Sequence, residues 1–143
     1  MINHVLDLIP DQKFASVAPK ATVREAARTM AERHIGAILV TEGSRLVGIF
    51  SERDILNRVV AKDLDPDATA VESVMTRNPD TLPPTATIRD AMRLMVAHDY
   101  RHVPVVDGQK IIGILSARDI YNNVVKNIQA GVSTLAREML TLG

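Results

Sequence analysis

The chain has 143 residues, of which 46% are hydrophobic and 24% are charged, enough for one ordinary soluble domain or two very small ones. Lys and Arg together number 17, as do Asp and Glu, so we expect neither nucleic acid nor a membrane as a partner. The absence of cysteine excludes disulfides and cysteine-ligated metal and agrees with the cytoplasmic location that we expect. The first ten residues lack a basic region and carry Asp7 in a short apolar stretch, so they do not form a signal peptide.

Two stretches of the sequence occur twice with the same offset. Residues 22–30 resemble residues 87–95, and residues 48–55 resemble residues 113–120, with an offset of 65 residues in both cases. One ungapped shift therefore aligns both blocks and everything between them, which chance matches would not do. We expect two copies of one structural unit.

A helix is predicted near the start of each copy. Thr22 and Glu25 form a capping-box pattern, and Thr87 and Asp90 form a weaker version of it. From Val23, apolar residues recur at i, i+3, i+4, i+7 and i+8, and the second copy has the same spacing. This spacing is typical of a helix with one buried face.

Two short strands are predicted to follow the helix in each copy. They cover 37–41 and 45–50 in the first copy and 103–106 and 110–115 in the second, and each pair is joined by a glycine-containing turn. A second helix is expected directly after each hairpin. A single unit of about 60 residues is marginal for an independent core, so we expect an α+β fold in which two repeats pack with pseudo-twofold symmetry.

These elements predict four parts of the chain. A polar linker containing Pro66 separates the repeats, since proline breaks regular structure. The parts are the first repeat with its N-terminal segment at 1–62, the linker with a short helical turn at 63–79, the second repeat at 80–128, and a helical tail at 129–143.

The end of the chain has more apolar residues than one terminal helix usually needs. They occur at Val124, Val125, Ile128, Val132, Leu135, Met139 and Leu142. Packing on the chain's own module is one explanation, and an interface between two copies is the sharper one. We expect a homodimer.

Three motifs identify a family that the chain resembles. They are Val74-Met-Thr76, His102-Val-Pro-Val-Val-Asp107 and a Gly-x-x-Ser-x-Arg-Asp block that occurs at 48–54 and 113–119. Together they resemble the CBS-domain family in the tandem arrangement called a Bateman module. The resemblance covers nearly the whole chain and leaves no segment for an attached enzyme or transporter, so a stand-alone member is expected. It implies the fold more specifically than the ligand.

The repeated block places polar groups where a strand meets a helix. Ser51 and Ser116 are predicted at helix N-termini, where free backbone N–H groups favour an anion, and an arginine and an aspartate follow in each block. These groups suit the phosphate and ribose diol of a nucleotide, although serine and aspartate also serve as ordinary helix caps. In the proteins that the chain resembles, the aspartate holds the ribose hydroxyls and the serine contacts phosphate. The resemblance carries the ribose role to Asp54 and Asp119.

The resemblance also implies that the base lies between the segment before the first helix and the first strand of each copy. The apolar residues among these suit simple core packing as well. The complete set of candidate binding residues is Ser16, Val17, Ala37, Ile38, Ser51, Arg53, Asp54, Thr81, Leu82, Tyr100, Arg101, His102, Val103, Ser116, Arg118 and Asp119.

The two copies differ around these blocks. The first strand begins with small neutral residues at 35–38 in the first copy and with large basic residues in the second. There, Arg101 and His102 are candidates either for phosphate contacts or for a solvated loop. Glu52 adds a negative charge that the second copy lacks. We therefore expect Asp119 to matter more for nucleotide affinity than its counterpart in the first copy.

Other functions are poorly supported. His98 and His102 have a metal-like spacing but no carboxylate or cysteine partner, so no metal is expected. The sequence offers no catalytic constellation and few aromatic residues for base stacking. We predict a non-catalytic regulatory module that senses an adenosine-containing nucleotide (AMP, ADP, ATP or NAD(H)) without an obligatory cofactor and acts on a partner protein. The alternative is a protein-interaction module without tight nucleotide binding.

Overall fold

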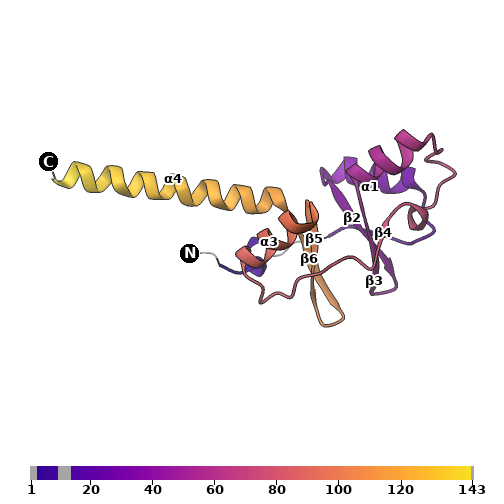
Figure 1. Cartoon of the computed structure of the whole chain (residues 1–143), viewed down its shortest axis with the longest axis horizontal. Coiled ribbons are helices and arrows are strands. Elements are labelled where there is room, and N and C mark those ends of the chain that lie inside the picture. The colour runs from indigo at the N-terminus through magenta and orange to yellow at the C-terminus, as the bar shows by residue number, and fades with distance from the viewer. Residues whose placement is uncertain (1–2, 10–13, 143) are drawn as a thin grey trace.

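The computed structural model describes residues 3–9 and 14–142, as an α+β body from which one long helix projects (Figure 1). The first repeat contains β1 (Ser16–Val17), α1 (Val23–Arg33), β2 (Ala37–Glu42), β3 (Arg45–Ser51) and α2 (Glu52–Asp54). The second contains α3 (Ile88–His98), β5 (His102–Asp107), β6 (Lys110–Ser116) and α4 (Ala117–Leu142), and β4 (Thr76–Arg77) precedes it. Short 3₁₀ turns cover Val5–Leu8, Val60–Lys62 and Val71–Ser73, and a π-helical turn covers Ile55–Val59. The predicted fold class with two repeats is confirmed.

Helices α1 and α3 both begin with complete capping boxes. The Thr22 hydroxyl accepts from the backbone N–H of Glu25 at 3.1 Å, and the Glu25 carboxylate accepts from the backbone N–H of Thr22 at 3.0 Å. Thr87 and Asp90 make the same two bonds, each at 3.0 Å. The shorter aspartate therefore closes its box as well as glutamate does, and both helices begin where the sequence predicts.

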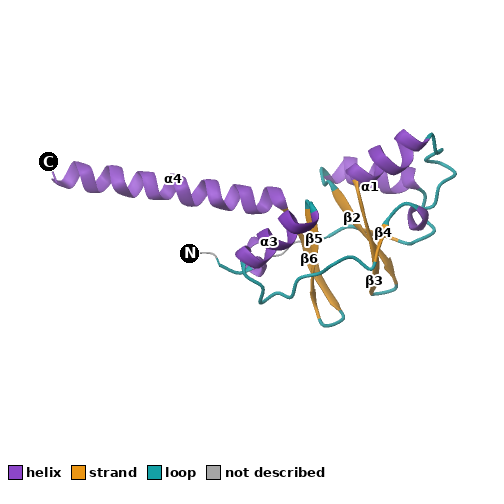
Figure 2. Cartoon of the chain, in the orientation of Figure 1, coloured by secondary structure: helices purple, strands orange, loops and turns teal. Residues whose placement is uncertain are grey.

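The two hairpins, β2–β3 and β5–β6, agree with the predicted strands to within one residue at each end. Their turns contain Gly43 and Gly108, whose φ angles of 61° and 60° lie in the left-handed region that glycine adopts without strain. Figure 2 shows the two hairpins lying side by side in the body. Strands β3 and β6 contact each other, so the junction between the repeats runs along the hairpins.

The strand order differs between the repeats. Within the described residues, the first repeat has a four-stranded sheet in the order β1-β2-β3-β4, with β1 parallel to β2 and the other pairs antiparallel. Strands β5 and β6 form a two-stranded sheet. In the second repeat, Leu82 takes the position of β1 through a single parallel bridge to Val105.

Packing of the N-terminal segment does not follow chain order. Val5 and Ile9 are buried in the core of the second repeat, whereas Val71 and Val74 are buried in the core of the first. The backbone N–H of Val5 donates to the carbonyl of Ala86 at 3.0 Å, and the N–H of Val71 donates to the equivalent carbonyl of the first repeat at 2.8 Å. The segment that precedes each repeat thus packs in the core of the other repeat. The predicted boundaries at 62 and 79 follow chain order and do not describe this exchange.

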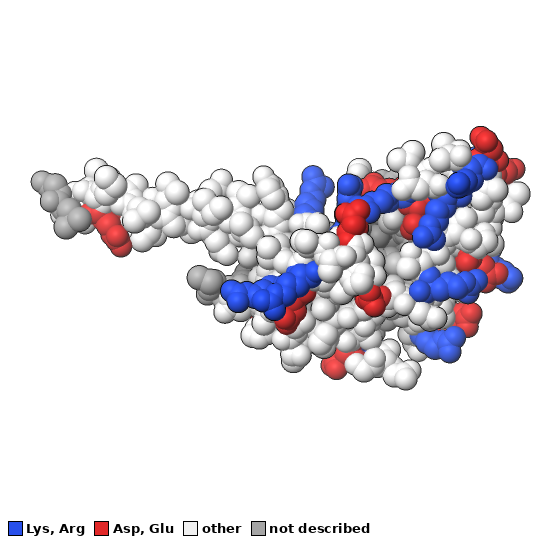
Figure 3. Space-filling view, viewed as in Figure 1, with Lys and Arg blue, Asp and Glu red and all other residues white. Residues whose placement is uncertain are grey.

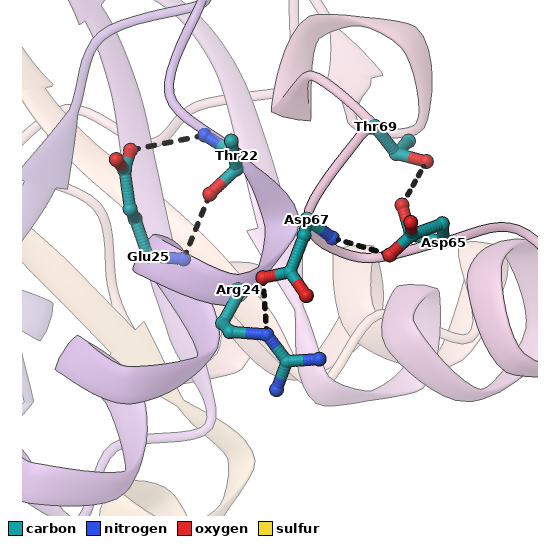
Figure 4. Close-up of polar contacts among 6 residues, drawn as sticks. All are labelled: Thr22, Arg24, Glu25, Asp65, Asp67 and Thr69. Atoms are coloured by element: carbon teal, nitrogen blue, oxygen red, sulfur yellow. Dashed lines mark hydrogen bonds and ion pairs between the residues drawn. The ribbon is translucent and has the colours of Figure 1, made fainter.

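The linker is anchored to the start of α1 (Figure 4). The Arg24 guanidinium pairs with the Asp67 carboxylate, and the N–H of Asp67 donates to the Asp65 carboxylate at 2.9 Å. The Thr69 hydroxyl donates to the Asp65 carbonyl at 2.7 Å, and the Thr69 carbonyl accepts from the N–H of Val23 at 2.9 Å. These bonds satisfy polar groups of both the linker and the first helical turn.

The second helix of each repeat begins directly after its hairpin, with Ser51 or Ser116 as the last strand residue. Their lengths then diverge. Helix α2 has three residues and passes into the π-helical turn, whereas α4 continues for 26 residues and crosses the expected boundary at 128 without a break. None of the described helices is long and apolar enough to cross a membrane.

Candidate functional site

Two cavities lie at the junction between the repeats, and we name each after its aspartate. The Asp119 cavity has a volume of about 340 Å³ and is lined by Phe14, Ala15, Ile35, Gly36, Ala37, Glu52, Arg101, His102, Ile114, Ser116, Ala117, Arg118 and Asp119. The Asp54 cavity has a volume of about 290 Å³ and is lined by Ile49, Ser51, Glu52, Arg53, Asp54, Asn57, Arg58, Thr76, Pro79, Asp80, His98, Asp99, Tyr100, Arg101 and His102.

Each cavity combines the Gly-x-x-Ser-x-Arg-Asp block of one repeat with the first-strand start of the other. Ser116, Arg118 and Asp119 face residues 35–37, and the block around Asp54 faces residues 100–102. The cavities are therefore equivalent under the 65-residue offset. Our sequence reasoning grouped each block with the strand start of its own copy, because spacing along the chain does not show which repeat faces which.

Serine and aspartate of each block form a helix cap. The Asp119 carboxylate accepts from the N–H of Ser116 at 2.9 Å, and the Ser116 hydroxyl accepts from the N–H of Asp119 at 3.0 Å. Ser51 and Asp54 make the same pair of bonds at 2.9 and 3.3 Å. Both blocks thus have the structural role that we considered as the alternative, and each cap occupies only one oxygen, Oδ2, of its aspartate.

The second carboxylate oxygen differs between the two aspartates. Oδ1 of Asp54 lies 3.4 Å from Nε of Arg58, which is one helical turn further along the chain. Oδ1 of Asp119 has no hydrogen-bond or ion-pair partner among the residues that the structure describes. The Asp119 carboxylate therefore has an oxygen open to accept from a ligand.

The arginines also differ in their partners. Arg53 donates through Nη1 to the Asp99 carbonyl at 2.9 Å and to the Asp99 carboxylate at 3.2 Å, which ties the first repeat to the second. Arg58 donates to the carbonyls of Val74 and Met75 at 3.2 and 3.0 Å. Nη1 of each of these arginines is thus engaged by the protein itself, whereas Nη2 of Arg53 is buried without a hydrogen-bond partner among the described residues.

Arg118 has no such acidic partner. The position equivalent to Asp99 is His34, and both residues end a helix in the left-handed conformation. The guanidinium groups of Arg118 and Arg101 make no hydrogen bond or ion pair in the described part of the chain, although the Arg101 carbonyl accepts from the N–H of Ala117 at 2.8 Å. Both line the Asp119 cavity, so that cavity has two uncommitted guanidinium groups.

His102 and Glu52 line both cavities, and Gly36 lies close to both side chains in the Asp119 cavity. A Cβ atom on Gly36 would lie 3.1 Å from Oε1 of Glu52 and 3.1 Å from Cε1 of His102, which shows how closely the three residues approach. Burial lowers the pKa of the His102 imidazole below its usual value, although the negative charges of Glu52 and Asp119 oppose the shift. The imidazole is therefore neutral near pH 7, and it would contact phosphate as a neutral donor.

The predicted binding residues divide into those that reach a cavity and those that do not. Ala37, Ser116, Arg118 and Asp119 line the Asp119 cavity, Ser51, Arg53, Asp54 and Tyr100 line the Asp54 cavity, and Arg101 and His102 line both. Ile38, Leu82 and Val103 are core residues, Val17 packs against the first core, and Ser16 and Thr81 are exposed at the surface.

Several lining residues were missed by sequence reasoning. Phe14 and Ala15 lie on the predicted extended segment, immediately before the residues we selected there. Arg58 follows Asp54 by four residues, a helical spacing that brings side chains together. This spacing could have indicated from the sequence that Arg58 lies near Asp54. Asp80 lines the Asp54 cavity, where its carboxylate accepts from the Tyr100 hydroxyl at 2.6 Å, and no local pattern indicates this pair.

The described residues contain no group of three or more His, Asp or Glu side chains arranged to hold a metal ion. The His98 ring instead stacks on the Tyr100 ring, with 5.1 Å between their centroids.

Comparison with known families matches the CBS domain twice, at residues 5–61 and 71–126. The chain belongs to the CBS-domain family. The CBS domain-containing protein YhcV of Bacillus subtilis is 36% identical over 130 residues, covering 91% of each chain. A CBS domain-containing protein of Arabidopsis thaliana is 32% identical over 134 residues, but the match spans only 24% of its length.

Solved structures agree with this assignment. A putative signal-transduction protein with CBS domains from Burkholderia ambifaria superimposes with a TM-score of 0.80 and 36% identity, covering 85% of this chain and 91% of that one. A CBS-domain protein from Pyrobaculum aerophilum complexed with AMP has a TM-score of 0.74 and 33% identity, covering 81% and 88%. CBS domains are regulatory modules that are usually non-catalytic and commonly bind adenine nucleotides.

Proposed function

We propose that this CBS module is a regulatory sensor that binds an adenosine-containing nucleotide between its repeats, with the Asp119 cavity as the stronger site. The observation that carries the proposal is the set of unsatisfied polar groups in that cavity. The guanidinium groups of Arg101 and Arg118 have no hydrogen-bond or ion-pair partner among the described residues, and neither does Oδ1 of Asp119. Two guanidinium groups and a carboxylate oxygen complement a phosphate and a ribose diol.

The remaining walls of the Asp119 cavity suit a nucleobase. Phe14, Ile35 and Ile114 supply apolar and aromatic surface to its lining. Ligand cavities usually combine such apolar walls with a few placed polar groups, and their volumes start at about 300 Å³. The related Pyrobaculum protein was solved with AMP, which supports an adenine nucleotide as the ligand class.

The Asp54 cavity is proposed as the weaker site. Its lining contains four carboxylates, at Glu52, Asp54, Asp80 and Asp99, against three guanidinium groups. A phosphate there would compete with Asp99 for Arg53, whose two bonds to that residue measure 2.9 and 3.2 Å. From the sequence, we ranked the sites by Arg101 and His102 of the second copy. These two residues line both cavities, so they do not distinguish the sites, and the ranking rests on the charges and ion pairs instead.

Because the ligand would contact both repeats, binding couples to their relative arrangement. The Arg53–Asp99 contact already joins the repeats across the Asp54 cavity. Within the described residues, Arg118 makes no such contact with the other repeat through its guanidinium group. A nucleotide bound between Arg118 and residues 35–37 would supply a contact on that side. Such binding shifts the arrangement only as far as the ligand's affinity differs between the two states.

A thermal-shift panel with AMP, ADP, ATP, NAD(H) and S-adenosylmethionine tests the proposal. A ligand at 100 times its Kd stabilises the folded protein by about 2.7 kcal/mol, and we expect at least one adenosine compound to do so. Arg118→Ala should reduce the shift for the ligands with phosphate and leave any shift for S-adenosylmethionine, which has none, unchanged. Protein shown to be free of carried-over nucleotide that responds to none of these compounds would instead support an interaction module without tight nucleotide binding.

A further inference from the structure

We propose that α4 forms a parallel two-stranded coiled coil with α4 of a second copy of the chain. The start of α4 packs on the body, where Ile120 and Asn123 are buried. From Lys126 to Thr141, every described residue is exposed. Figure 1 shows this part of the helix extending away from the body, and the space-filling view in Figure 3 shows its visible face as mostly uncharged.

A row of apolar residues along α4, all exposed except the half-buried Val125, follows a heptad pattern, and the exposed Val124 and Leu140 lie outside it. The intervals in this row alternate between four and three residues, along the set Tyr121, Val125, Ile128, Val132, Leu135 and Met139. Ile128, Val132 and Leu135 are each about 60% exposed and Met139 is 73% exposed, so the stripe lacks a partner within the described chain. A sustained 3.5-residue period is the pattern with which one helix packs along another in a left-handed supercoil.

The residue types along this stripe favour two parallel helices. Val125 and Val132 occupy alternate seam positions, of the kind labelled a, and Ile128 and Leu135 occupy the positions labelled d. Valine at a with leucine at d, as at Val132 and Leu135, favours two strands in parallel coiled coils, whereas the β-branched Ile128 at d departs from that pattern.

The positions flanking the seam permit two identical helices to approach. In a parallel pair, Gly131 of one copy lies beside Ala136 of the other, five residues further along the chain. Both side chains are small, and a Cβ placed on Gly131 would meet nothing within 4 Å. Among the flanking residues Asn122, Val124, Gln129, Gly131, Ala136 and Glu138, only the last is charged, so like charges do not oppose the pairing of two copies.

Local propensity gives an independent reason for a partner. Residues 131–134 read Gly-Val-Ser-Thr, all weak helix formers, in the middle of the projecting segment. A helical segment of this length is marginal in water when it packs against nothing. Packing of the apolar stripe against an identical stripe supplies the missing stabilisation. This proposal does not depend on nucleotide binding.

Sedimentation equilibrium from micromolar to millimolar concentration tests the pairing. Wild-type protein is expected to be a dimer, and the variant Val132→Glu with Leu135→Glu is expected to be a monomer. Ser133→Glu places the same charge on the outer face and should remain a dimer. Because these positions are exposed, the body should keep its thermal unfolding midpoint in every variant. A wild-type monomer, as expected if α4 instead binds a different protein, overturns the proposal, and so does a dimer that survives the double substitution.

The orientation can be tested separately because the chain has no cysteine. In a parallel pair, residue 135 of one copy faces residue 135 of the other, so Leu135→Cys should form a disulfide-linked dimer on mild oxidation. Ala130→Cys lies on the outer face and serves as the matched control, which should stay unlinked. A wild-type dimer in which Leu135→Cys is linked no faster than Ala130→Cys rules out the parallel arrangement.

Discussion

Replacing Asp119 by alanine is expected to weaken nucleotide affinity by roughly ten- to a hundredfold. In the proposed site the open Oδ1 oxygen of Asp119 would accept from ribose hydroxyls, and losing a hydrogen bond to a charged group costs about 1.5–3 kcal/mol. In Asp54, Oδ2 accepts from Ser51 and Oδ1 pairs with Arg58. Both oxygens of Asp54 thus already have protein partners, one of them in a partly exposed ion pair, so a ligand gains little from them and Asp54→Ala should cost less than about 1 kcal/mol, or roughly fivefold.

Both substitutions remove the acid of a helix cap, so they form a matched pair. An acid in the first helical turn contributes about 0.3–1 kcal/mol, so each variant should lose about this much folding stability in urea titration, and Asp54→Ala slightly more because it also removes the ion pair with Arg58. Calorimetric titration of both variants with the best ligand then compares affinity alone. If Asp54→Ala abolishes binding and Asp119→Ala leaves it intact, the reasoning from free carboxylate oxygens and unpaired guanidinium groups is refuted.

Two further outcomes follow from the same geometry. Asp99→Asn, which suits the left-handed backbone at this position (φ 55°), removes the negative charge that holds Arg53, so nucleotide occupancy of the Asp54 cavity should rise; an unchanged stoichiometry and affinity in calorimetry would contradict this role. Burial lowers the pKa of His102 in the folded protein below its value of about 6.5 in the unfolded chain. The neutral imidazole therefore contributes its full stability above about pH 6.5, and this contribution is lost as the pH falls from there through the lower folded pKa. Urea unfolding across this range should show a decline that His102→Gln reduces, and identical pH dependence in the two proteins would mean that another group is responsible.

The local architecture of this protein could be predicted from its sequence. The capping residues Thr22 and Thr87 begin their helices because each side chain and a nearby acid satisfy backbone N–H groups within four residues. The hairpins follow from apolar strands and glycine turns, which act over similarly short distances. The 65-residue repeat then indicates two equivalent units, since a pattern that folds one way in the first copy folds the same way in the second.

The candidate site depended on contacts between the repeats, which no local pattern encodes. Only the tertiary structure places Asp119 opposite residues 35–37, and only it engages Arg53 with Asp99 while leaving Arg118 unpaired. It also packs Val5 on the second repeat, because the two repeats exchange the segments that precede them. Sequence spacing determines which side chains share an element, whereas the packing of one repeat against the other decides which charges meet across the junction.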